Sequence, residues 1–473
     1  MEPTSEQHNI LDLAEGQRNL QINASAGTGK TSTIKIIDWA LDPHPRLYLA
    51  FNKRVVEEMK REDEEGNTPL RSTTEVKTLN GLGHGVWAKA ISSRLVLNTR
   101  KITENFKEFA KPQSKDATKY LWDRFDEITT AVAMAKALGF IPTNAPNWER
   151  RLIDVEGFFS GLEEKLEPAA IDAVDGILRL SIRQAYAGNI DFNDQLYMPA
   201  LFGGSFPNFP LIFIDEAQDL SPVNVEMLAK MKRSRLIAVG DPAQSIYGFR
   251  GAMTNGMGKQ ADRFAMLRSR LSVSFRCPSA IVENARWRVP DFKWFREGGK
   301  VAILEGLDPC RVVDGSAFIC RNNAPLFRLA LNLLSVGRSV SMAGTDIGPK
   351  LLNVLRRLGD ESISRSAVFS AIDAWQAKRP DSKNAADFAT CLRLFANLGT
   401  NLSQAIAYAE HILNQDGQIH LSTGHKAKGM EWPTVYHLDP WLIGDIDQEQ
   451  NLRYVIQTRA KEEYYEIKTD QIG

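Results

Sequence analysis

The sequence predicts an α/β protein with more than one domain and with parallel sheets at its centre. Its 473 residues are too many for one ordinary hydrophobic core. Short apolar runs alternate with segments of helical periodicity, which is the pattern of buried parallel strands linked by helices. Hydrophobic residues make up 43% of the chain and charged residues 25%, which argues against a disordered, fibrous or membrane protein.

The first α/β domain is expected in two pieces, 1–84 and 207–268. Its strands are predicted at 20–23, 47–51, 211–214 and 236–239. Between 85 and 206 the pattern changes to long helical periodicity, with breaks near Pro142 and Pro146, and the clearest helices are predicted at 120–138 and 169–187. We interpret 85–206 as a helical domain inserted into the first α/β domain.

A second α/β domain is expected at 269–347 and 415–473. Its predicted elements are a helix at 325–334 and strands at 317–320, 419–422 and 434–438. The segment between its two pieces, 348–414, again has a helical pattern and contains a predicted loop at 378–384. We interpret it as a second, smaller insertion.

Charge, cysteine content and the N-terminal segment bear on partners and location. Lys+Arg and Asp+Glu both total 58, so the net charge is zero and a nucleic-acid partner needs a local basic groove. The cysteines form no CxxC pair, and all four are expected as small buried side chains of a reduced protein: Cys277, Cys310, Cys320 and Cys391. Residues 1–9 do not have the pattern of a signal peptide, and no apolar run is long enough to span a bilayer. We expect neither secretion nor membrane insertion.

A phosphate-binding loop is predicted directly after the first strand, where the sequence is INASAGTGKT. Backbone N–H groups in such a loop, and the start of the following helix, bind phosphate. Lys30 can reach the β- and γ-phosphates, Thr31 offers a hydroxyl to Mg²⁺, and Gly27 and Gly29 let the backbone approach closely. Ala24 stands where the strict GxxxxGK[ST] pattern has glycine. A chance glycine turn is the alternative, but the flanking strand and helix favour phosphate binding.

An acidic segment follows the strand predicted at 211–214. It begins with Asp215 and Glu216 and continues Ala-Gln-Asp. Asp215 can hold Mg²⁺, and Glu216 can orient and deprotonate the attacking water. A solvated acidic helix cap is the alternative interpretation. The presence of Lys30 in the first loop favours the catalytic one.

At these motifs the sequence resembles the superfamily 1 helicases of the UvrD/Rep type, and the resemblance covers nearly the whole chain. The family's own loop is Ala-x-Ala-Gly-x-Gly-Lys-Thr, which accounts for Ala24. The segment 240–251, GDPAQSIYGFRG, is a near-complete copy of the family segment that couples nucleotide to DNA. The resemblance implies two RecA-like P-loop NTPase lobes with parallel sheets, each carrying a helical insertion.

The resemblance also assigns nucleotide contacts outside the loop. Gln7 reads the adenine, Phe275 stacks on it, and Glu431 contacts the ribose. The full set of nucleotide ligands expected is Gln7, Ala26, Gly27, Thr28, Gly29, Lys30, Thr31, Ser32, Phe275 and Glu431. The implied cofactors are ATP and Mg²⁺, with Thr31 and Asp215 as the metal ligands.

Catalytic roles are assigned in the same way. Gln244 follows the strand at 236–239, where its amide can sense the γ-phosphate. Arg276 is expected on the γ-phosphate, and Arg459 as an arginine finger that neutralises developing charge. The catalytic set expected is Lys30, Glu216, Gln244, Arg276 and Arg459. A surface arginine paired with a carboxylate is the alternative for Arg459.

DNA contacts are expected on both lobes. They are Phe51, Asn52, Lys53, Thr78, Asn80, Tyr247, Phe249, Thr423 and His425. Phe249 replaces the family's usual base-stacking tryptophan, and Asn80 its usual histidine. An aromatic face suits sequence-tolerant stacking, with core packing as the alternative for Phe249. Lys53 and Arg54 have the alternative of a solvated helix start. The segment Asp191-Phe-Asn-Asp194 also resembles the family, in a structural role.

The function implied is an ATP-driven motor that moves 3′ to 5′ on single-stranded DNA and unwinds DNA. Both insertions are short for the family, and the second is the one that commonly restrains unwinding. The partner expected is single-stranded DNA, or a duplex with a single-stranded tail. A separate nuclease or repair protein is a possible partner, and a fused nuclease is not expected because the chain ends soon after Arg459. We expect a cytoplasmic, nucleoid-associated protein of a bacterial or phage-infected cell.

Two alternatives remain at this point. The first is a DNA-stimulated ATPase that remodels protein–DNA complexes without processive unwinding. The second is a nucleotide-gated interaction module that does not hydrolyse ATP, which the presence of Lys30, Glu216 and Arg459 disfavours.

Overall fold

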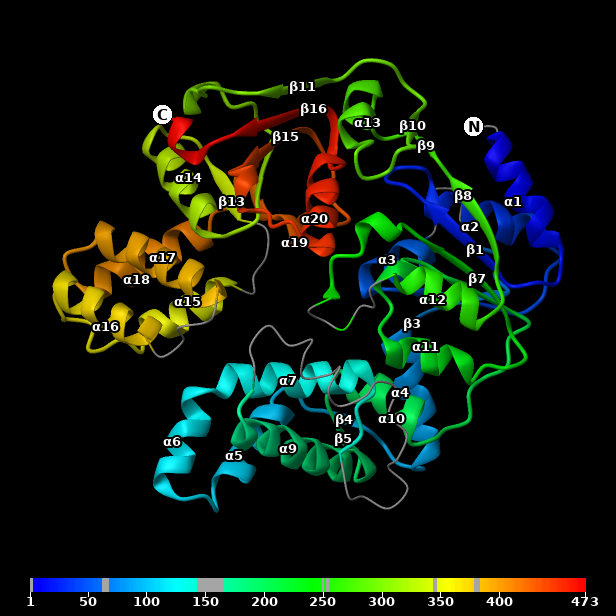
Figure 1. Ribbon diagram of the computed structural model, residues 1–473, viewed down its shortest axis with the longest axis horizontal. Coiled ribbons are helices and arrows are strands. Elements are labelled where there is room, and N and C mark those ends of the chain that lie inside the picture. The colour runs from blue at the N-terminus through cyan, green and yellow to red at the C-terminus, as the bar shows by residue number, and fades with distance from the viewer. Residues whose placement is uncertain are drawn as a thin grey trace. The chain divides into compact units, whose positions relative to one another are not determined.

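The computed structural model contains two six-stranded parallel sheets, one in each half of the chain (Figure 1). The structure describes residues 3–61, 68–142, 166–248, 251, 255–342, 347–377 and 383–473. The chain forms two compact units. The first unit contains Met1–Ala24 and Gly29–Leu271, and the second contains Ser25–Thr28 and Ser272–Gly473.

The sheet of the first unit has the strand order β3-β2-β6-β7-β1-β8, and every pair in it is parallel. Its strands are β1 (Leu20–Ala24), β2 (Arg46–Ala50), β3 (Thr74–Thr78), β6 (Leu211–Ile214), β7 (Arg235–Gly240) and β8 (Leu267–Leu271). The inner strands are buried along almost their whole length, which is why they appear as continuous apolar runs in the sequence. Because β6, β7 and β1 are neighbours, the loops after them share one edge of the sheet.

Helices cover the sheet of the first unit. They are α1 (Ser5–Glu15), α2 (Lys30–Ala40), α3 (Lys53–Lys60), α11 (Pro222–Ala229) and α12 (Gly256–Arg263), with short 3₁₀ turns at η1 (Ala217–Asp219) and η2 (Pro242–Gln244). Apolar side chains of α1 and α2, including Ile10 and Ile34, pack with strand residues such as Ile22 and Val239 in one buried cluster. The start of α2 is therefore fixed against the sheet edge.

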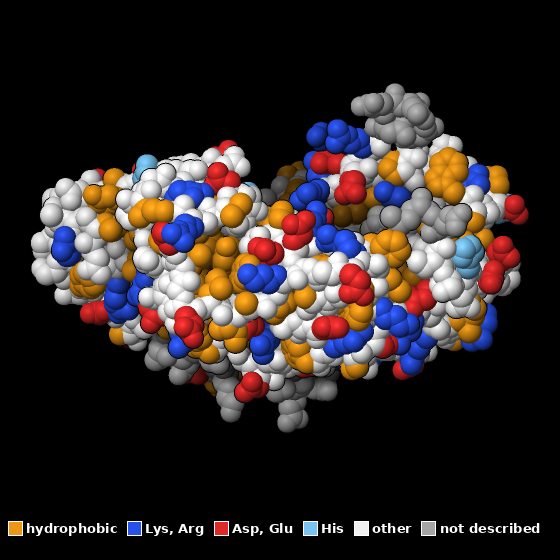
Figure 2. All heavy atoms as spheres, turned by 90° about the horizontal axis from the view of Figure 1, so that it is seen from above, with side chains coloured by type: hydrophobic (Ala, Val, Ile, Leu, Met, Phe, Trp, Pro, Cys, Tyr) orange, Lys and Arg blue, Asp and Glu red, His pale blue; other side chains and the backbone are white. Residues whose placement is uncertain are grey.

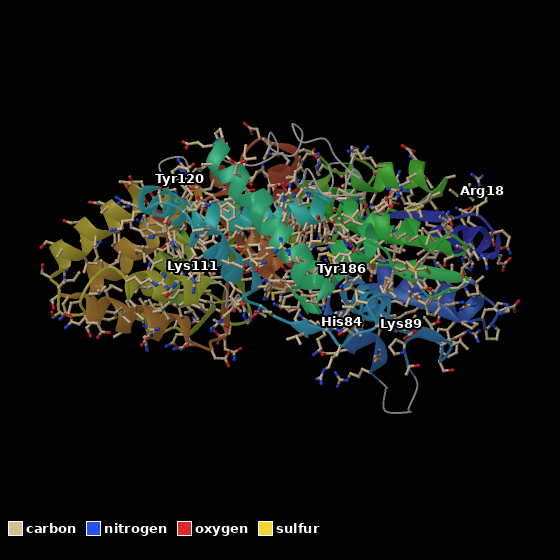
Figure 3. The ribbon with its side chains drawn as sticks, turned by 90° about the horizontal axis from the view of Figure 1, so that it is seen from below. Arg18, His84, Lys89, Lys111, Tyr120 and Tyr186 are labelled. Atoms are coloured by element: carbon tan, nitrogen blue, oxygen red, sulfur yellow. The ribbon has the colours of Figure 1, made fainter. Side chains whose placement is uncertain are left out.

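The first insertion is helical, as the sequence predicts. It contains α4 (Leu79–Ala90), α5 (Lys101–Ala110), α6 (Lys115–Asp123), α7 (Phe125–Leu138), α9 (Pro168–Tyr186) and α10 (Asp194–Leu201), with a short parallel pair β4 (Val96–Leu97) and β5 (Asn189–Ile190). The prediction of one continuous helix at 120–138 is wrong, because this segment contains the end of α6 and all of α7, which are separated at Arg124. Figure 3 shows Tyr186 on α9, whose ring packs edge-on against Trp87 of α4 with centroids 5.1 Å apart.

Four charged side chains are buried together in this insertion: Lys101, Lys136, Asp191 and Asp194, called here the lysine–aspartate cluster. Lys101 Nζ donates to Asp194 Oδ2 at 2.5 Å and to the backbone oxygen of Ser181 at 2.8 Å. Lys136 Nζ donates to Asp194 Oδ1 and Asp191 Oδ2, both at 2.6 Å, and to Ser181 Oγ at 2.8 Å. The cluster thus ties α5, α7 and α9 to the start of α10, and gives Asp191 and Asp194 the structural role expected for them.

The sheet of the second unit has the order β11-β16-β15-β12-β14-β13 and is also parallel throughout. Its strands are β11 (Lys300–Ile303), β12 (Ala317–Cys320), β13 (Val340–Met342), β14 (Ile419–Thr423), β15 (Trp432–Leu438) and β16 (Ala460–Ile467), beside a parallel ribbon of β9 (Val273–Ser274) and β10 (Lys293–Trp294). Its helices are α13 (Ser279–Ala285), α14 (Ala324–Ser335), α19 (Gly424–Ala427) and α20 (Asp447–Gln457), with 3₁₀ turns at η4 (Pro309–Arg311), η5 (Pro440–Leu442) and η6 (Thr469–Gln471). Both units are therefore α/β lobes, as the sequence predicts.

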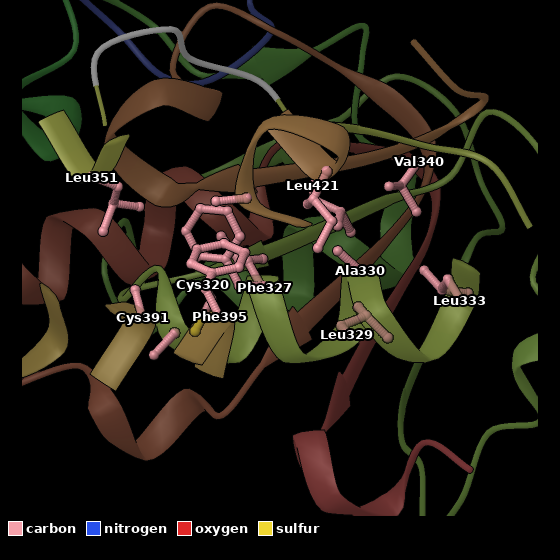
Figure 4. Close-up of a cluster of buried hydrophobic side chains, with 14 of the residues drawn as sticks. Cys320, Phe327, Leu329, Ala330, Leu333, Val340, Leu351, Cys391, Phe395 and Leu421 are labelled. Atoms are coloured by element: carbon pink, nitrogen blue, oxygen red, sulfur yellow. The ribbon is translucent and has the colours of Figure 1, made fainter. Parts of the chain in front are cut away.

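The second insertion shares its hydrophobic core with the lobe that carries it. Its helices are α15 (Ile347–Leu355), α16 (Arg365–Ala377), α17 (Lys383–Leu398) and α18 (Leu402–Leu413). Figure 4 shows Phe395 and Cys391 of α17 against Phe327 of α14, and the rings of Phe327 and Phe395 meet edge-on with centroids 5.1 Å apart. Most of the loop predicted at 378–384 lies outside the described residues.

The four-part domain division stays a prediction. The two compact units divide between Leu271 and Ser272, and the boundary predicted at 84/85 falls inside α4. Three cysteines are buried as expected, but the expectation is wrong for Cys310, which is exposed. Among the described residues, no helix combines the length and the apolar character needed to cross a bilayer.

Candidate nucleotide and DNA site

The predicted phosphate loop connects β1 to α2. Gly27 and Gly29 have φ angles of 69° and 81°, a left-handed backbone that favours glycine. Lys30 is the first residue of α2, so the loop ends at a helix N-terminus, where backbone N–H groups can bind an anion. Thr28 is buried and its hydroxyl donates to the backbone oxygen of Ser25 at 2.9 Å. The loop has the local geometry that phosphate binding requires.

The acidic residues after β6 lie against the start of α2. Lys30 Nζ donates to Glu216 Oε2 at 3.0 Å, and Thr31 Oγ1 donates to Asp215 Oδ2 at 3.3 Å. Tyr48 of β2 donates its hydroxyl to the same Asp215 oxygen at 2.6 Å. Glu216 has a φ of 51°, a left-handed backbone that is strained for a residue with a side chain. The structure therefore brings together the two motifs that the sequence predicts as partners.

Burial shapes the electrostatics of this edge. Burial raises the pKa of Asp215, and the neighbouring charge of Glu216 raises it further. Burial likewise raises the pKa of Asp241, which follows β7. For Lys30, burial alone would lower the pKa, but the charges of Glu216, Asp241 and Asp215 outweigh burial and raise it. The mostly buried Lys30 ammonium group pairs with Glu216 and is influenced by the charges of Asp241 and Asp215, an arrangement suited to a polyphosphate and a divalent cation.

A chain of hydrogen bonds runs from the Glu216 carboxylate to the segment after β7. Gln218 Nε2 donates to Glu216 Oε2 at 2.6 Å, and Gln218 Oε1 accepts the backbone N–H of Asp241 at 2.9 Å. Gln244 Nε2 then donates to Asp241 Oδ2 at 2.7 Å. A Cβ on Gly240 would lie 2.4 Å from Gln218 Oε1 and 3.0 Å from the backbone nitrogen of Gln218, so a larger residue here would have to displace Gln218. We call the side chains of Glu216, Gln218, Asp241 and Gln244 the relay.

Gln7, the residue expected to read adenine, is almost fully buried. Its Oε1 accepts the backbone N–H of Thr4 at 2.9 Å in a capping box at the start of α1. Its Nε2 donates to Thr33 Oγ1 on α2 at 3.1 Å. The structure thus places this amide beside the phosphate-loop helix, and base reading by Gln7 stays a prediction.

Residues 25–28 of the loop group with the second unit. Ala26 donates its N–H to the Tyr454 hydroxyl at 3.1 Å, and its backbone oxygen accepts from Ser274 Oγ at 2.9 Å. Phe275 donates its backbone N–H to the oxygen of Gly27 at 2.9 Å. The predicted adenine platform is therefore connected to the phosphate loop through its own backbone.

The two arginines assigned to catalysis have different surroundings. Arg276 Nε donates to Glu431 Oε2 at 2.6 Å, and Lys461 Nζ lies 2.6 Å from Glu431 Oε1. Arg459 is 1% exposed, which rules out the surface-arginine alternative, and its Nε and Nη1 donate to the backbone oxygens of Val455 and Met430. Both arginines and Glu431 are close enough to Cys277 for their charges to influence its pKa, which burial raises.

Two aromatic residues expected on DNA meet in the first unit. Phe51, which follows β2, stacks on Tyr247 with ring centroids 6.0 Å apart and planes 9° apart. Asn52 caps α3 by accepting the N–H of Val55, and Lys53 is 88% exposed beside Glu57. The rings of Phe51 and Tyr247 are partly exposed. They form an aromatic surface at the end of the segment that carries Gln244.

The other predicted DNA residues are placed as follows. Thr78 caps α4, and Asn80 Nδ2 donates to the backbone oxygen of Phe192 at 2.8 Å. Thr423 and His425 are half-buried at the start of α19 in the second unit. Phe249 lies outside the described residues. On the face shown in Figure 2, Lys and Arg side chains are interspersed with Asp and Glu, consistent with the zero net charge.

Comparison with known families decides the identity of the fold. The model of the UvrD/REP helicase N-terminal domain matches residues 4–265, which is more than half of the chain. The chain belongs to the UvrD/REP helicase family. The matched region contains the phosphate loop, the acidic motif and the relay.

Two curated relatives of this UvrD/REP family member align with 97% of its length. F-box DNA helicase protein 1 of Schizosaccharomyces pombe is 24% identical over 527 residues, and F-box DNA helicase 1 of Gallus gallus is 26% identical over 509 residues. The alignments cover 56% and 48% of those proteins, so the chain spans about half the length of these relatives. The RecBCD enzyme subunit RecB of Mycobacterium tuberculosis is 38% identical over 76 residues, or 16% of this chain.

Several contributors to the site were missed by sequence reasoning. The sequence pattern places Tyr48 only within an apolar strand, whereas in the structure its hydroxyl donates to Asp215. Gln218 lies within the acidic motif and Tyr454 within the last motif, but the sequence alone assigns neither a role. In the structure Gln218 accepts the N–H of Asp241, and the Tyr454 hydroxyl accepts the N–H of Ala26. The signal available for Tyr48 and Tyr454 was a polar hydroxyl in an otherwise apolar buried run, since a buried Tyr hydroxyl usually has a partner.

Proposed function

We propose that this UvrD/REP family chain is a DNA helicase that hydrolyses ATP to move 3′ to 5′ along single-stranded DNA. The observation that carries the proposal is the relay in the first unit. It starts at Glu216, which pairs with Lys30, and ends at Gln244. Three residues further on, Tyr247 stacks on Phe51. A change at the phosphate end can therefore reach an aromatic surface suited to single-stranded DNA.

Glu216 is proposed as the catalytic base and Lys30 as the phosphate ligand. The two side chains form an ion pair at 3.0 Å. A bound polyphosphate would attract Lys30, which leaves the Glu216 carboxylate to orient a water molecule and accept its proton. Gln218 donates to Glu216 and would keep the carboxylate in place during that exchange.

Thr31 and Asp215 would hold the Mg²⁺ that such a reaction needs. A hydroxyl and a carboxylate are the oxygen ligands that this ion prefers, and the two groups already face each other at 3.3 Å. When bound, the ion shields the charge of the β- and γ-phosphates. Tyr48 holds the Asp215 carboxylate from the neighbouring strand β2 and so fixes its orientation.

Residues of the second unit are proposed to complete the nucleotide site. Phe275 would stack on the adenine, and its backbone contact with Gly27 supports that position. Arg276 would contact the γ-phosphate and Glu431 the ribose, which requires their ion pair at 2.6 Å to open. Arg459 would stabilise the charge that develops in the transition state. With these assignments, we propose that ATP is hydrolysed between the two lobes.

The experiment measures ATP turnover with and without a single-stranded oligonucleotide, and strand displacement on duplexes with a 3′ or a 5′ tail. We expect turnover to depend on the oligonucleotide, and unwinding to require the 3′ tail. Lys30→Ala should abolish turnover, whereas Lys35→Ala, a lysine change on the same helix α2, should not. Equal turnover with and without DNA would overturn the motor.

The same experiment separates the alternative function. A chain that remodels protein–DNA complexes would show DNA-dependent turnover and would remove a tightly bound protein from the oligonucleotide, yet would not separate a tailed duplex. The proposed helicase separates the strands.

A further inference from the structure

An exposed aromatic ring lies beside the proposed adenine platform. Phe295 follows β10, and its side chain is 64% exposed. Its ring centroid is 5.1 Å from that of Phe275, and the two planes are inclined by 42°. The two rings together form an apolar corner, named here the Phe275–Phe295 corner.

The parallel ribbon of β9 and β10 builds this corner. Val273 pairs with Lys293 and Ser274 with Trp294, so the next residues of the two strands are Phe275 and Phe295. The backbone N–H of Phe295 donates to the oxygen of Ser274 at 3.0 Å, which extends the ladder to that point. Because neighbouring residues in register project to the same face, the two rings lie together.

The side chains on either side of Phe295 in the sequence have other partners and do not cover its ring. Trp294 makes its own contacts, donating to Glu297 Oε1 at 2.9 Å and stacking under Arg286. Arg296 donates to the backbone oxygen of Lys461 at 2.6 Å. A ring that only supported Phe275 from behind would be covered by protein, whereas most of the Phe295 surface is open.

We propose that Phe295 is a second wall of the base site and makes the enzyme prefer purine nucleotides. The proposal rests on the assignment of Phe275 to the base under the proposed function. A purine has two fused rings, so its face can cover Phe275 while its far edge reaches Phe295. A pyrimidine has one ring and contacts Phe275 alone. Inclined aromatic pairs of this kind are favourable.

The test compares ADP and UDP binding by titration calorimetry in the full chain. Phe295→Ala should weaken ADP binding about two- to tenfold, the effect of one lost aromatic contact, and should leave UDP binding nearly unchanged. Phe295→Trp, which keeps an aromatic ring at this position, should bind ADP as tightly as the parent chain. Phe275→Ala should weaken both nucleotides. Ile303→Ala is the matched control, because Ile303 is an apolar side chain that is 78% exposed on β11.

Each outcome decides the inference. An equal loss of ADP and UDP affinity in Phe295→Ala would mean that the ring only supports Phe275, and would overturn the proposal, as would unchanged affinity for both. No ADP binding by the parent chain would overturn it together with the nucleotide site. Because binding is measured without turnover, an ATPase that ignores DNA would refute the motor function and leave this inference standing.

Discussion

Replacement of Lys136 by methionine should destabilise the first unit strongly. Lys136 is fully buried, and its ammonium group donates three hydrogen bonds of 2.6 to 2.8 Å, two of them to carboxylates. Methionine preserves the length and apolar stem of the side chain but removes the charge. Asp191 and Asp194 would then remain buried after losing the Lys136 ammonium group. Asp194 would still be paired with Lys101.

The expected loss of unfolding free energy comes from the carboxylate charge that stays buried without its partner. Breaking a buried ion pair costs about 3–5 kcal/mol, because an uncompensated charge stays in the interior. Burial lowers the pKa of Lys101 despite the opposing charge of Asp194, whereas the pKa of Lys136 is raised once Asp194 and Asp191 outweigh its burial. Lys136 is therefore the cation whose burial is better compensated by nearby carboxylates. We expect Lys136→Met to lower the free energy of unfolding by about 3–5 kcal/mol. Domains are stable by about 5–15 kcal/mol, so such a loss is a large fraction.

The assay is urea unfolding followed by tryptophan fluorescence, since Trp87 is buried in α4 of the same unit. Lys53→Met is the control: Lys53 also forms an ion pair, with Glu57 at 3.5 Å, but its side chain is 88% exposed. Exposed pairs contribute roughly 0–1 kcal/mol. A double-mutant cycle with Asp191→Asn should show coupling of about 1–3 kcal/mol. If Lys136→Met costs no more than Lys53→Met, the cluster is not holding the insertion.

Three further predictions concern the site and the second unit. Glu216→Gln should retain ATP binding and lose turnover, measured by nucleotide titration and steady-state ATPase, because the amide cannot accept a proton; near-normal turnover would mean that the base is another residue. Gly240→Ala should weaken the DNA stimulation of ATPase, because its Cβ would lie 2.4 Å from Gln218 Oε1 in the relay; unchanged stimulation would exclude the relay as the coupling path. Burial lowers the pKa of His437 to about 3, from 6.5, so the unfolded chain binds the proton first as pH falls, and stability is lost below pH 6.5. The loss should reach roughly 2 kcal/mol at pH 5 and be absent in His437→Gln, judged by urea unfolding at several pH values; an equal slope in both proteins would refute the assignment.

The strands were predictable where burial dominates the sequence. The runs at 211–214 and 317–320 form β6 and β12 at the predicted residues, because both are apolar and fully buried. The separation of α6 from α7 had no such signal, since no glycine or proline stands near Arg124. There the Arg124 guanidinium lies over the ring of Tyr120 and contacts Glu127, both close in sequence. It also pairs with Glu167 at 3.2 Å, and this tertiary contact is not encoded in the local pattern.

The candidate site was predictable in outline and not in its internal contacts. The loops after parallel strands share one edge, so the approach of Lys30 to Glu216 follows from the order of the motifs and the fold class. The left-handed backbone of Glu216 and the close approach of Gly240 to Gln218 depend on the packing of η1 against β7, which appears only when the chain is folded. The roles carried over for Gln7, Arg276 and Arg459 stay predictions.

The shared core of the second insertion limits how the proposed influence of this insertion on unwinding can be tested. Deleting 348–414 would remove Cys391 and Phe395 from their contacts and leave Phe327 of α14 facing water. The shortened protein would therefore lose part of the interior of its lobe, and any change in activity would report misfolding as much as release from restraint. In this chain the insertion is not a detachable module, and its influence has to be sought through exposed side chains of α16 and α18, one at a time.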